Sequence, residues 1–372
     1  PEIALKIDRI DIYHVSMPLL APWKTAFSEE HAIESILVRM ESDGTVGWGE
    51  AAPYSGPQFC AEWCPAAFLL IRDVFATLLI GRDIASGGQL QGLLAPFKAN
   101  QFAKAALDTA WWDLQARRAG QPLWQMLGGS APLIEVGADI PVQDSIEALL
   151  ARVAAAQEAG FTRTKLKFRR DSGVAMVARV RESFPDMPVH IDCNCGFTLD
   201  DLPLFRELDA LGLVMIEQPL AGDDLVHHAR LQGRLTTPLC LDESITSLER
   251  ARKAIEIGAC RWMNIKHGRV GGLTNALEVY QVCRESDVPC WIGGMLESNI
   301  GQGASIALAT LSGLSYAPDI FPAGRLYHSD LATPDLVGVS ASSIRASNLP
   351  GHGFQPVPEK LQAMTLQSAA AT

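Results

Sequence analysis

The stretch that decides the fold begins with TRTKLKF (162–168) and PVHIDCN (188–194) and continues through LVMIEQP (213–219), PLCLDES (238–244) and RWMNIKH (261–267). Each segment is a short run of apolar and β-branched residues, as expected of a buried strand. Longer stretches with apolar residues at helical spacing lie between them. Strands that alternate with helices pair in parallel, so this part of the chain predicts repeated strand–helix units.

Three more candidate strands extend the pattern at both ends, namely LIEVGADI (133–140), PCWIGG (289–294) and YAPDI (316–320). With them the chain has eight strand–helix units of nearly constant length. This repetition predicts an α/β fold with a modified (β/α)₈ barrel of the TIM type. An open doubly wound sheet is the alternative, and length alone does not distinguish the two.

The first 125 residues follow a different pattern. Antiparallel strands are predicted in residues 3–15 and 34–51, the latter with a Ser-Asp-Gly turn, and a long helix in residues 100–120. We therefore predict three parts, listed here in chain order: an α+β capping domain (1–125), the barrel (126–330) and a C-terminal segment rich in Gly, Pro and Ser that packs back on the capping domain (331–372).

Composition narrows the class of protein. The chain has 372 residues, of which 48% are hydrophobic and 20% charged, as in ordinary globular proteins. The formal net charge of −11 argues against a nucleic-acid partner. We find no apolar run long enough for a membrane helix and no signal-peptide pattern, so we expect a cytoplasmic protein. The eight cysteines are scattered along the chain and predict free thiols rather than a disulfide framework.

Charged residues recur at the strand ends at steps of 25, 25, 25 and 24 residues, in the series Lys167, Asp192, Glu217, Asp242 and Lys266. The carboxyl ends of barrel strands share one face, and active sites lie there. An isolated acid at such a place could be a helix N-cap. Three buried acids together would repel one another unless a cation sat among them, and a hard divalent ion fits. We predict Mg²⁺ as the cofactor, with Mn²⁺ as the alternative.

The lysines complete this pattern. Lys165 and Lys167 alternate with Leu166 and Phe168, so both ammonium groups share one face of the strand. If the two apolar residues pack under the outer helices, the lysines face the lumen, and Lys266 lies roughly opposite. Lysines on both sides of one carbon could remove a proton next to a carboxylate and return it. We expect burial and neighbouring positive charge to lower their pKa values toward the range of a base.

Five further segments carry a resemblance to the enolase superfamily: DCNCGFTL (192–199), IEQPLAGDDLVHHA (216–229), PLCLDESI (238–245), GRVGGL (268–273) and GGMLESNIG (293–301). The pair KLK and NIKHGRVGG resembles the muconate-lactonising branch, closest to the o-succinylbenzoate synthases and N-succinylamino acid racemases. The strand PCWIGG lacks the histidine of the mandelate-racemase branch. The chain departs from the family pattern at His267, at 302–305 and at 319–322, where a substrate tail would lie.

The resemblance implies roles for individual residues and an enzyme that is commonly a homo-oligomer acting on a small carboxylate. Metal ligands are expected at Asp192, Glu217 and Asp242, and the acid/base pair at Lys167 and Lys266 with Lys165 beside them. Substrate contacts are expected from residues of both domains: Trp23, Phe27, Tyr54, Asn194, Arg269 and Met295. For the three aromatic residues, packing in the core of the capping domain is the alternative.

The implied reaction is metal-dependent removal of the proton α to a carboxylate through an enediolate. It fits an N-succinylamino acid (N-acylamino acid) racemase, an o-succinylbenzoate synthase, or both. The alternatives are a muconate-cycloisomerase-like lyase, an epimerase of another acid, and an inactive binding protein. The last would have lost a metal ligand or a lysine, and none is missing from the sequence.

Overall fold

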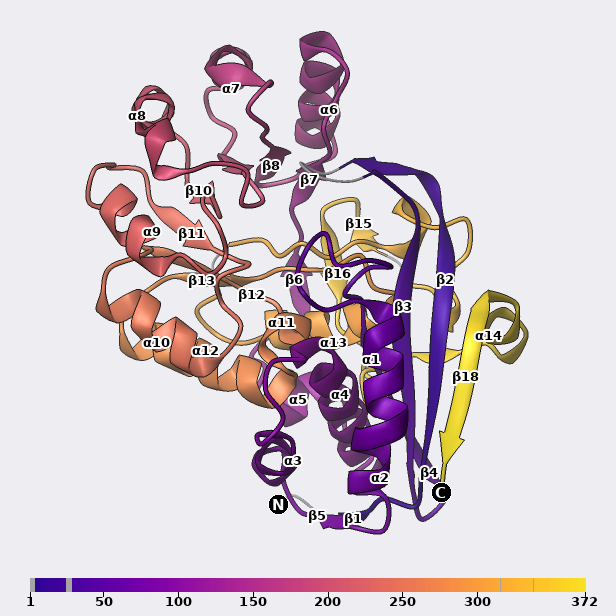
Figure 1. Ribbon diagram of the computed structural model, residues 1–372. Helices are drawn as coiled ribbons and strands as arrows, with labels where there is room; N and C mark the ends of the chain where they lie inside the picture. Colours follow the sequence, from indigo (N-terminus) through magenta and orange to yellow (C-terminus); the bar gives the residue numbers. More distant parts are fainter. Residues whose placement is uncertain (1–3, 25–28, 315, 337) are drawn as a thin grey trace.

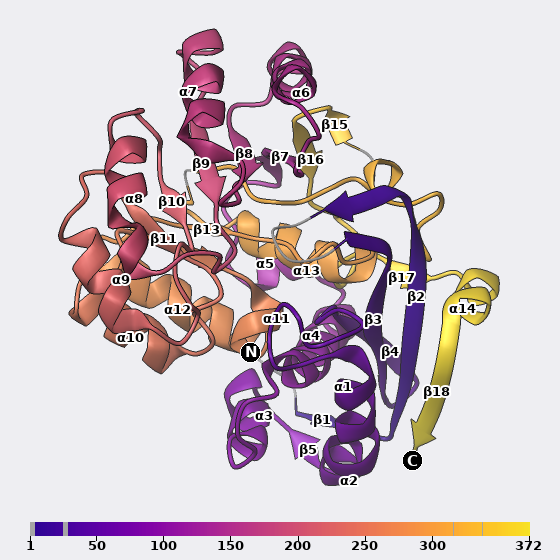
Figure 2. The same cartoon turned by 45° about the horizontal axis from the view of Figure 1, so that its top comes forward.

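The computed structural model describes residues 4–24, 29–314, 316–336 and 338–372. A curled parallel sheet surrounded by helices forms one side of the molecule, and an antiparallel sheet with its own helices forms the other (Figures 1 and 2). The predicted α/β barrel with an α+β capping domain is confirmed as the architecture. The domain limits at residues 125 and 330 stay a prediction.

The described part of the chain contains seven parallel strands whose order in the sheet follows the sequence. In this sheet Lys167 pairs with Asp192, and Asp192 pairs with Glu217, across neighbouring strands. The register therefore places one end of the lysine strand beside two of the acids. The strands are β7 (Ala138–Ile140), β8 (Thr164–Lys167), β9 (Val189–Asp192), β10 (Ile216–Glu217), β11 (Leu239–Leu241), β12 (Trp262–Ile265) and β13 (Cys290–Ile292).

The predicted eighth strand, 316–320, is not a strand in the structure. One backbone hydrogen bond on each side holds this segment between the two ends of the sheet. Asp319 N donates to Ile292 O (3.1 Å), and Gly137 N donates to Pro318 O (3.0 Å). Pro318 has no N–H with which to extend a ladder. The barrel is therefore closed by a bridging segment instead of a paired strand.

Helices cover the outer face of the sheet, and apolar side chains fill the space between. Leu166 and Phe168 are buried there with Val153 and Val177, as the alternation with the lysines predicted. Gly160 and Gly212 have φ of +82° and +67° just after two of the helices, as expected of C-caps. The helices of the barrel are α6 (Ile146–Glu158), α7 (Gly173–Ser183), α8 (Leu202–Asp209), α9 (Leu225–Gln232), α10 (Leu248–Glu256), α11 (His267–Val270), α12 (Leu273–Glu285) and α13 (Asn299–Ala309).

The capping sheet has the strand order β18–β2–β3–β4, and its helix α4 packs directly on β4. A Cβ added at Gly47 or Gly49 would lie 2.4 or 2.1 Å from backbone oxygens of α4, so this close approach requires glycine. Asp43 and Gly44, with φ of 47° and 73°, form the predicted turn. The elements are β2 (Arg9–Lys24), β3 (Glu29–Ser42), β4 (Thr45–Ala51), β18 (Thr365–Ala371), α1 (Cys64–Leu70), α2 (Ala76–Leu79), α3 (Gly87–Leu94) and α4 (Gln101–Arg118).

The two sides of the molecule are joined through the chain ends and through Glu50. Strand β18, at the C-terminus, runs antiparallel to β2 (Figure 2). Glu50 of β4 accepts hydrogen bonds from the backbone N–H groups of Ser298 (3.0 Å) and Gly301 (2.9 Å) at the start of α13. A carboxylate there satisfies two N–H groups that the helix itself leaves free.

Short elements complete the fold. The predicted strand 133–140 is divided at Gly137, so that only its second half joins the parallel sheet and its first half pairs with β16. No helix in the described residues has the length and apolar character needed to span a membrane. The remaining elements are β1 (Leu5–Lys6), β5 (Asp83–Ile84), α5 (Leu123–Met126), β6 (Leu133–Glu135), β14 (Ala332–Thr333), β15 (Gly338–Ser340), β16 (Ser343–Arg345), β17 (Gln355–Pro356), α14 (Pro358–Met364), a π-helical turn (Ile71–Phe75) and two 3₁₀ turns (Leu199–Asp201 and Ala323–Arg325).

Candidate active site

Three acids predicted as metal ligands lie together at the carboxyl ends of neighbouring strands. Asp192 and Glu217 end β9 and β10, and Asp242 directly follows β11; all three are fully buried. Neighbouring side chains orient Glu217. Asn264 Nδ2 donates to its Oε1 (2.8 Å), and His190 Nε2 lies 3.3 Å from its Oε2. The strand register thus brings residues 25 positions apart into one cluster.

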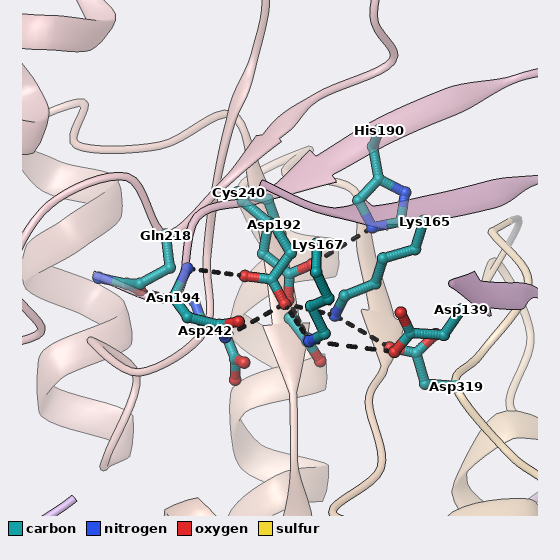
Figure 3. Close-up of polar contacts among 12 residues, drawn as sticks. Asp139, Lys165, Lys167, His190, Asp192, Asn194, Gln218, Cys240, Asp242 and Asp319 are labelled. Atoms are coloured by element: carbon teal, nitrogen blue, oxygen red, sulfur yellow. Dashed lines mark hydrogen bonds and ion pairs between the residues drawn. The ribbon is translucent and has the colours of Figure 1, made fainter. Parts of the chain in front are cut away.

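The two lysines of β8 point into this cluster, as Figure 3 shows. Lys165 Nζ lies 2.9 Å from Asp192 Oδ2, 2.9 Å from Glu217 Oε2 and 3.2 Å from Asp319 Oδ2. Lys167 Nζ donates to Asp192 Oδ2 at 2.7 Å. The prediction that both ammonium groups face the lumen is confirmed by these contacts.

A second group of cations surrounds Asp242. Lys266 Nζ lies 3.0 Å from Asp242 Oδ2, and Arg269 Nε donates to Asp242 Oδ1 at 3.2 Å. Met295 Sδ accepts from Lys266 Nζ at 3.6 Å. The lysines of β8 and Lys266 therefore approach the acids from different strands of the curled sheet, β8 and the end of β12.

One small cavity of about 30 Å³ joins these groups. Its barrel wall includes Lys165, Lys167, Asn194, Lys266 and Met295, and its other wall comes from Trp23 and Tyr54 of the capping side. Every described residue that we predicted for the site therefore lies on this cavity or directly behind it. Asp192, Glu217 and Asp242 contact its lysines, and Arg269 contacts Asp242. Phe27 lies outside the described residues.

The expected direction of the lysine pKa values is wrong for the β8 pair. Burial is the largest single effect and lowers the pKa of Lys167, but Asp192, Asp139 and Glu217 together raise it by more, so the net pKa lies above its ordinary value. The pKa of Lys165 is likewise raised, because Asp192, Asp319 and Glu217 together outweigh its burial. Neighbouring positive charge does lower the pKa of Lys167, but the carboxylates that face both amines have the larger combined effect.

The oxygen atoms of this site are of the kind that bind a hard divalent cation. Among the described residues, however, no three His, Cys, Asp or Glu side chains form a group that could hold a metal ion as they stand. Several buried oxygens near the strand ends accept no hydrogen bond, among them Asp242 Oδ2, Glu243 Oε2, Asn194 Oδ1 and, on β7, Asp139 Oδ1. Asp242 Oδ2 instead forms the ion pair with Lys266. The cluster thus combines carboxylate and amide oxygens, which such cations prefer.

Several residues of the site were missed by the sequence argument. Asp319 forms ion pairs with Arg163 and Lys165. The Phe59 ring lies over Lys266 (5.6 Å) and Arg269 (4.7 Å). Phe59 belongs to a capping-domain loop without periodicity, so its sequence carried no signal. Asp319 ends a predicted strand, and the rule that selected the other strand-end acids would have found it.

Asp139 of β7 is the other missed acid, and it lines the same cavity. Burial raises its pKa, against the opposing effect of Lys167 and Lys165. The sequence pattern that indicated the other acids also applies to Asp139, because it stands near the end of the predicted strand LIEVGADI, one strand before Lys167.

Comparisons with known proteins agree with this geometry. Residues 8–128 match the family model for the N-terminal domain of mandelate racemase / muconate lactonizing enzyme, and residues 148–360 match the enolase C-terminal domain-like model. The chain therefore belongs to the enolase superfamily, and it is an enzyme. Members of this superfamily bind a divalent metal ion.

Individual relatives show which members of the superfamily this chain is similar to. The chain is 40% identical to an o-succinylbenzoate synthase of Geobacillus kaustophilus, covering 95% of this chain and 94% of that protein. It is 37% identical to an N-succinylamino acid racemase of Thermus thermophilus, covering 95% and 93%. A solved enolase-superfamily member from Listeria innocua superposes with a TM-score of 0.95 at 32% identity, covering 98% and 99%. The resemblance drawn from the sequence is thus confirmed.

Proposed function

We propose that this enzyme removes the proton α to a carboxylate and forms an enediolate, acting as an N-acylamino acid racemase, an o-succinylbenzoate synthase, or both. The observation that carries the proposal is the shared cavity, which Lys167 and Lys266 both line beside three buried acids. One relative named an o-succinylbenzoate synthase and another named an N-succinylamino acid racemase each match 95% of the chain. They support the proposal without naming the substrate of this enzyme.

Asp192, Glu217 and Asp242 would hold the divalent cation, for which we propose Mg²⁺, with Mn²⁺ as the alternative. When bound, such an ion supplies Lewis-acid stabilisation to the negative charge that develops on the substrate carboxylate. Glu243 and Asn194 stand next to these ligands, since Asn194 Nδ2 donates to both Asp192 Oδ2 (3.2 Å) and Glu243 Oε1 (3.1 Å). We propose that Asn194 keeps the two acids in place.

The lysines would move the proton. One of the pair Lys167 and Lys266 takes it from the α-carbon, and the other delivers a proton to the opposite face, which inverts the centre. Lys165 would hold the substrate carboxylate. A base needs an unprotonated amine, and the pKa of Lys167 falls toward that range once Asp192 shares its charge with a cation. If the substrate carries a leaving group on the β-carbon, its departure gives elimination instead.

The remaining predicted residues would shape the pocket. Arg269 Nε donates to Asp242 Oδ1 (3.2 Å), and its Nη2 lies 3.1 Å from the same oxygen as an ion pair, so the guanidinium helps to fix the carboxylate that also contacts Lys266. Met295, Trp23 and Tyr54 supply apolar surface around the non-reacting part of the substrate.

The proposal is tested by racemisation and deuterium uptake in D₂O with N-succinyl- and N-acetylamino acids. We expect wild-type enzyme with Mg²⁺ to do both, and to stop on chelation. Lys167→Ala and Lys266→Ala should racemise at least about 100-fold more slowly, the usual contribution of a general base. Lys98→Ala is the matched control, because Lys98 is an exposed lysine outside the cavity.

Formation of o-succinylbenzoate is followed separately by chromatography with the same variants. Full activity of either cavity variant, or no deuterium uptake with any carboxylate of the panel, would contradict the proposal. Uptake with muconate-type or other acids alone would favour a lyase or another epimerase.

A further inference from the structure

Two acids line the cavity, Asp139 and Asp319, and among the described residues only Asp139 has a carboxylate oxygen without a hydrogen-bond donor. Its side chain, on β7, is only 6% exposed, and its Oδ1 accepts no hydrogen bond. Oδ2 lies 4.0 Å from Lys167 Nζ, beyond hydrogen-bond distance. Figure 3 shows the Asp139 carboxylate beside the lysines. A buried carboxylate oxygen without a donor is costly, so a donor from outside the chain is expected to satisfy it.

Asp319, the neighbouring acid on the same cavity, shows the contrast. Its Oδ1 is bound by Arg163 and its Oδ2 lies 3.2 Å from Lys165 Nζ. Two cations therefore engage Asp319, and it has no oxygen left for a ligand. The difference singles out Asp139 as the acid of this wall that can contact a substrate.

The surroundings of Asp139 suit a positively charged group. Trp23, Tyr54, Phe59 and Phe321 line the same cavity, and the Trp23 and Phe321 rings meet edge to face at 6.1 Å. Aromatic faces and a carboxylate together attract an ammonium or guanidinium group. A second substrate carboxylate at this wall would instead meet the like charge of Asp139.

We propose that Asp139 binds a cationic N–H group of the substrate, so that the preferred substrate is an amino-acid derivative carrying an ammonium or guanidinium besides its reacting carboxylate. This assignment rests on the proposed function and names its substrate class. The cationic group can belong to the amino-acid side chain or to the acyl end, and both present the same chemistry to Asp139.

Matched substrates separate these cases. N-succinyl-, N-acetyl- and glycyl-methionine share one reacting centre and differ in the charge at the acyl end, whereas Nα-acetyl-lysine carries its charge on the side chain. We expect kcat/KM for α-deuterium exchange to be highest for a cationic member, with the succinyl compound lowest. If glycyl-methionine has the higher kcat/KM, the cationic group belongs to the acyl end of the substrate. If Nα-acetyl-lysine has the higher value, the cationic group belongs to the amino-acid side chain.

Asp139→Asn keeps the size of the side chain and removes its charge. The preference for the cationic over the succinyl substrate should fall about 10- to 100-fold, the range for a hydrogen bond between charged groups, mainly through KM. Asp139→Ser provides a second variant should the first fold poorly. Asp186→Asn, at an exposed aspartate on the loop before β9, is the control and should leave the preference unchanged.

The outcomes separate this inference from the proposed function. Equal changes for all substrates, confined to kcat, would show that Asp139 acts only through Lys167 and would overturn the assignment. A wild-type preference for the succinyl substrate would also overturn it, while the proton-transfer function stands. Absence of exchange with every carboxylate tested would refute the proposed function itself.

Discussion

Arg163 is a buried cation that binds the segment 316–320, which lacks the backbone hydrogen bonds of a paired strand. Its guanidinium donates to Ala317 O from Nε (3.0 Å) and Nη2 (2.7 Å), and it forms an ion pair with Asp319. It also lies over the Trp291 ring at 5.2 Å. A Cβ at Gly137 would lie 1.9 Å from its Cζ, so only glycine leaves room for it. Arg163 thereby attaches the bridging segment 316–320 to β8.

Replacing Arg163 by Met should destabilise the protein by about 3–5 kcal/mol, the cost of leaving a buried ion-pair partner uncompensated. The measurement is the free energy of unfolding from urea titration. Arg179→Met is the matched control, because the Arg179–Glu182 pair is 54% and 70% exposed and such pairs contribute about 0–1 kcal/mol. Similar small losses in both variants would contradict the role given to Arg163.

At the scale of single residues, sequence reasoning found the charges that repeat with the strand period. Asp192, Glu217 and Asp242 stand at constant spacing, and the parallel register pairs Asp192 with Glu217 and places Asp242 at the end of the next strand. It missed the pKa direction of Lys167, because that direction depends on distances such as the 2.7 Å to Asp192. It also missed Arg163, which directly precedes β8, because the sequence does not show the partners that make this arginine different from an exposed one.

Helix α9 contains a histidine whose hydrogen bonds fix the neutral ring. His228 Nδ1 donates to Asp224 O (2.6 Å), and its Nε2 accepts from Leu220 N (3.2 Å) in the loop after β10. Protonation of the ring would put a hydrogen on Nε2, so that two N–H donors, His228 Nε2–H and Leu220 N–H, would face each other. Burial lowers the pKa of His228 to about 4, despite the opposing effect of Asp224.

This shift predicts a pH dependence of stability. An unfolded histidine titrates near pH 6.5, so between about pH 4 and 6.5 the unfolded state binds more protons than the folded state. Stability therefore rises with pH across this window, by about 3 kcal/mol from His228 alone. The difference in unfolding free energy between wild type and His228→Gln should grow by that amount from pH 4 to 7.

His31→Gln is the control for this measurement, because the His31 side chain is 75% exposed. It should show no such change. A constant difference between wild type and His228→Gln from pH 4 to 7 would rule out a buried neutral ring.

At the scale of elements, the alternation of strands and helices was predictable because hydrophobic period and turn residues encode it. Two features were not. The segment 316–320 has the composition of a strand but is bridged by single bonds on either side, and Pro318 cannot donate. The segment 133–140 serves two sheets because Arg163 fills the space beside Gly137. Both outcomes depend on contacts between distant residues.

Across the whole molecule, the cavity is assembled from two parts of the chain. Trp23, Tyr54 and Phe59 of the capping side face lysines that lie more than 100 positions later in the sequence. Strand β18 and the Glu50 contacts with α13 hold these parts together. Sequence alone indicated that capping residues belong to the site and carried a strand-end signal for Asp139 and Asp319, whereas the place of Phe59 over Lys266 and Arg269 is known only from the assembled cavity.

We propose that Lys167 and Lys266 serve opposite faces of one carbon, and this proposal makes a stereochemical prediction. It is tested most directly by α-deuterium exchange of each separate enantiomer of a substrate that the wild-type enzyme racemises. We predict that Lys167→Ala exchanges only one enantiomer, Lys266→Ala only the other, and that neither racemises. Exchange of both enantiomers by a single-lysine variant, or loss of the same enantiomer in both variants, would contradict the account.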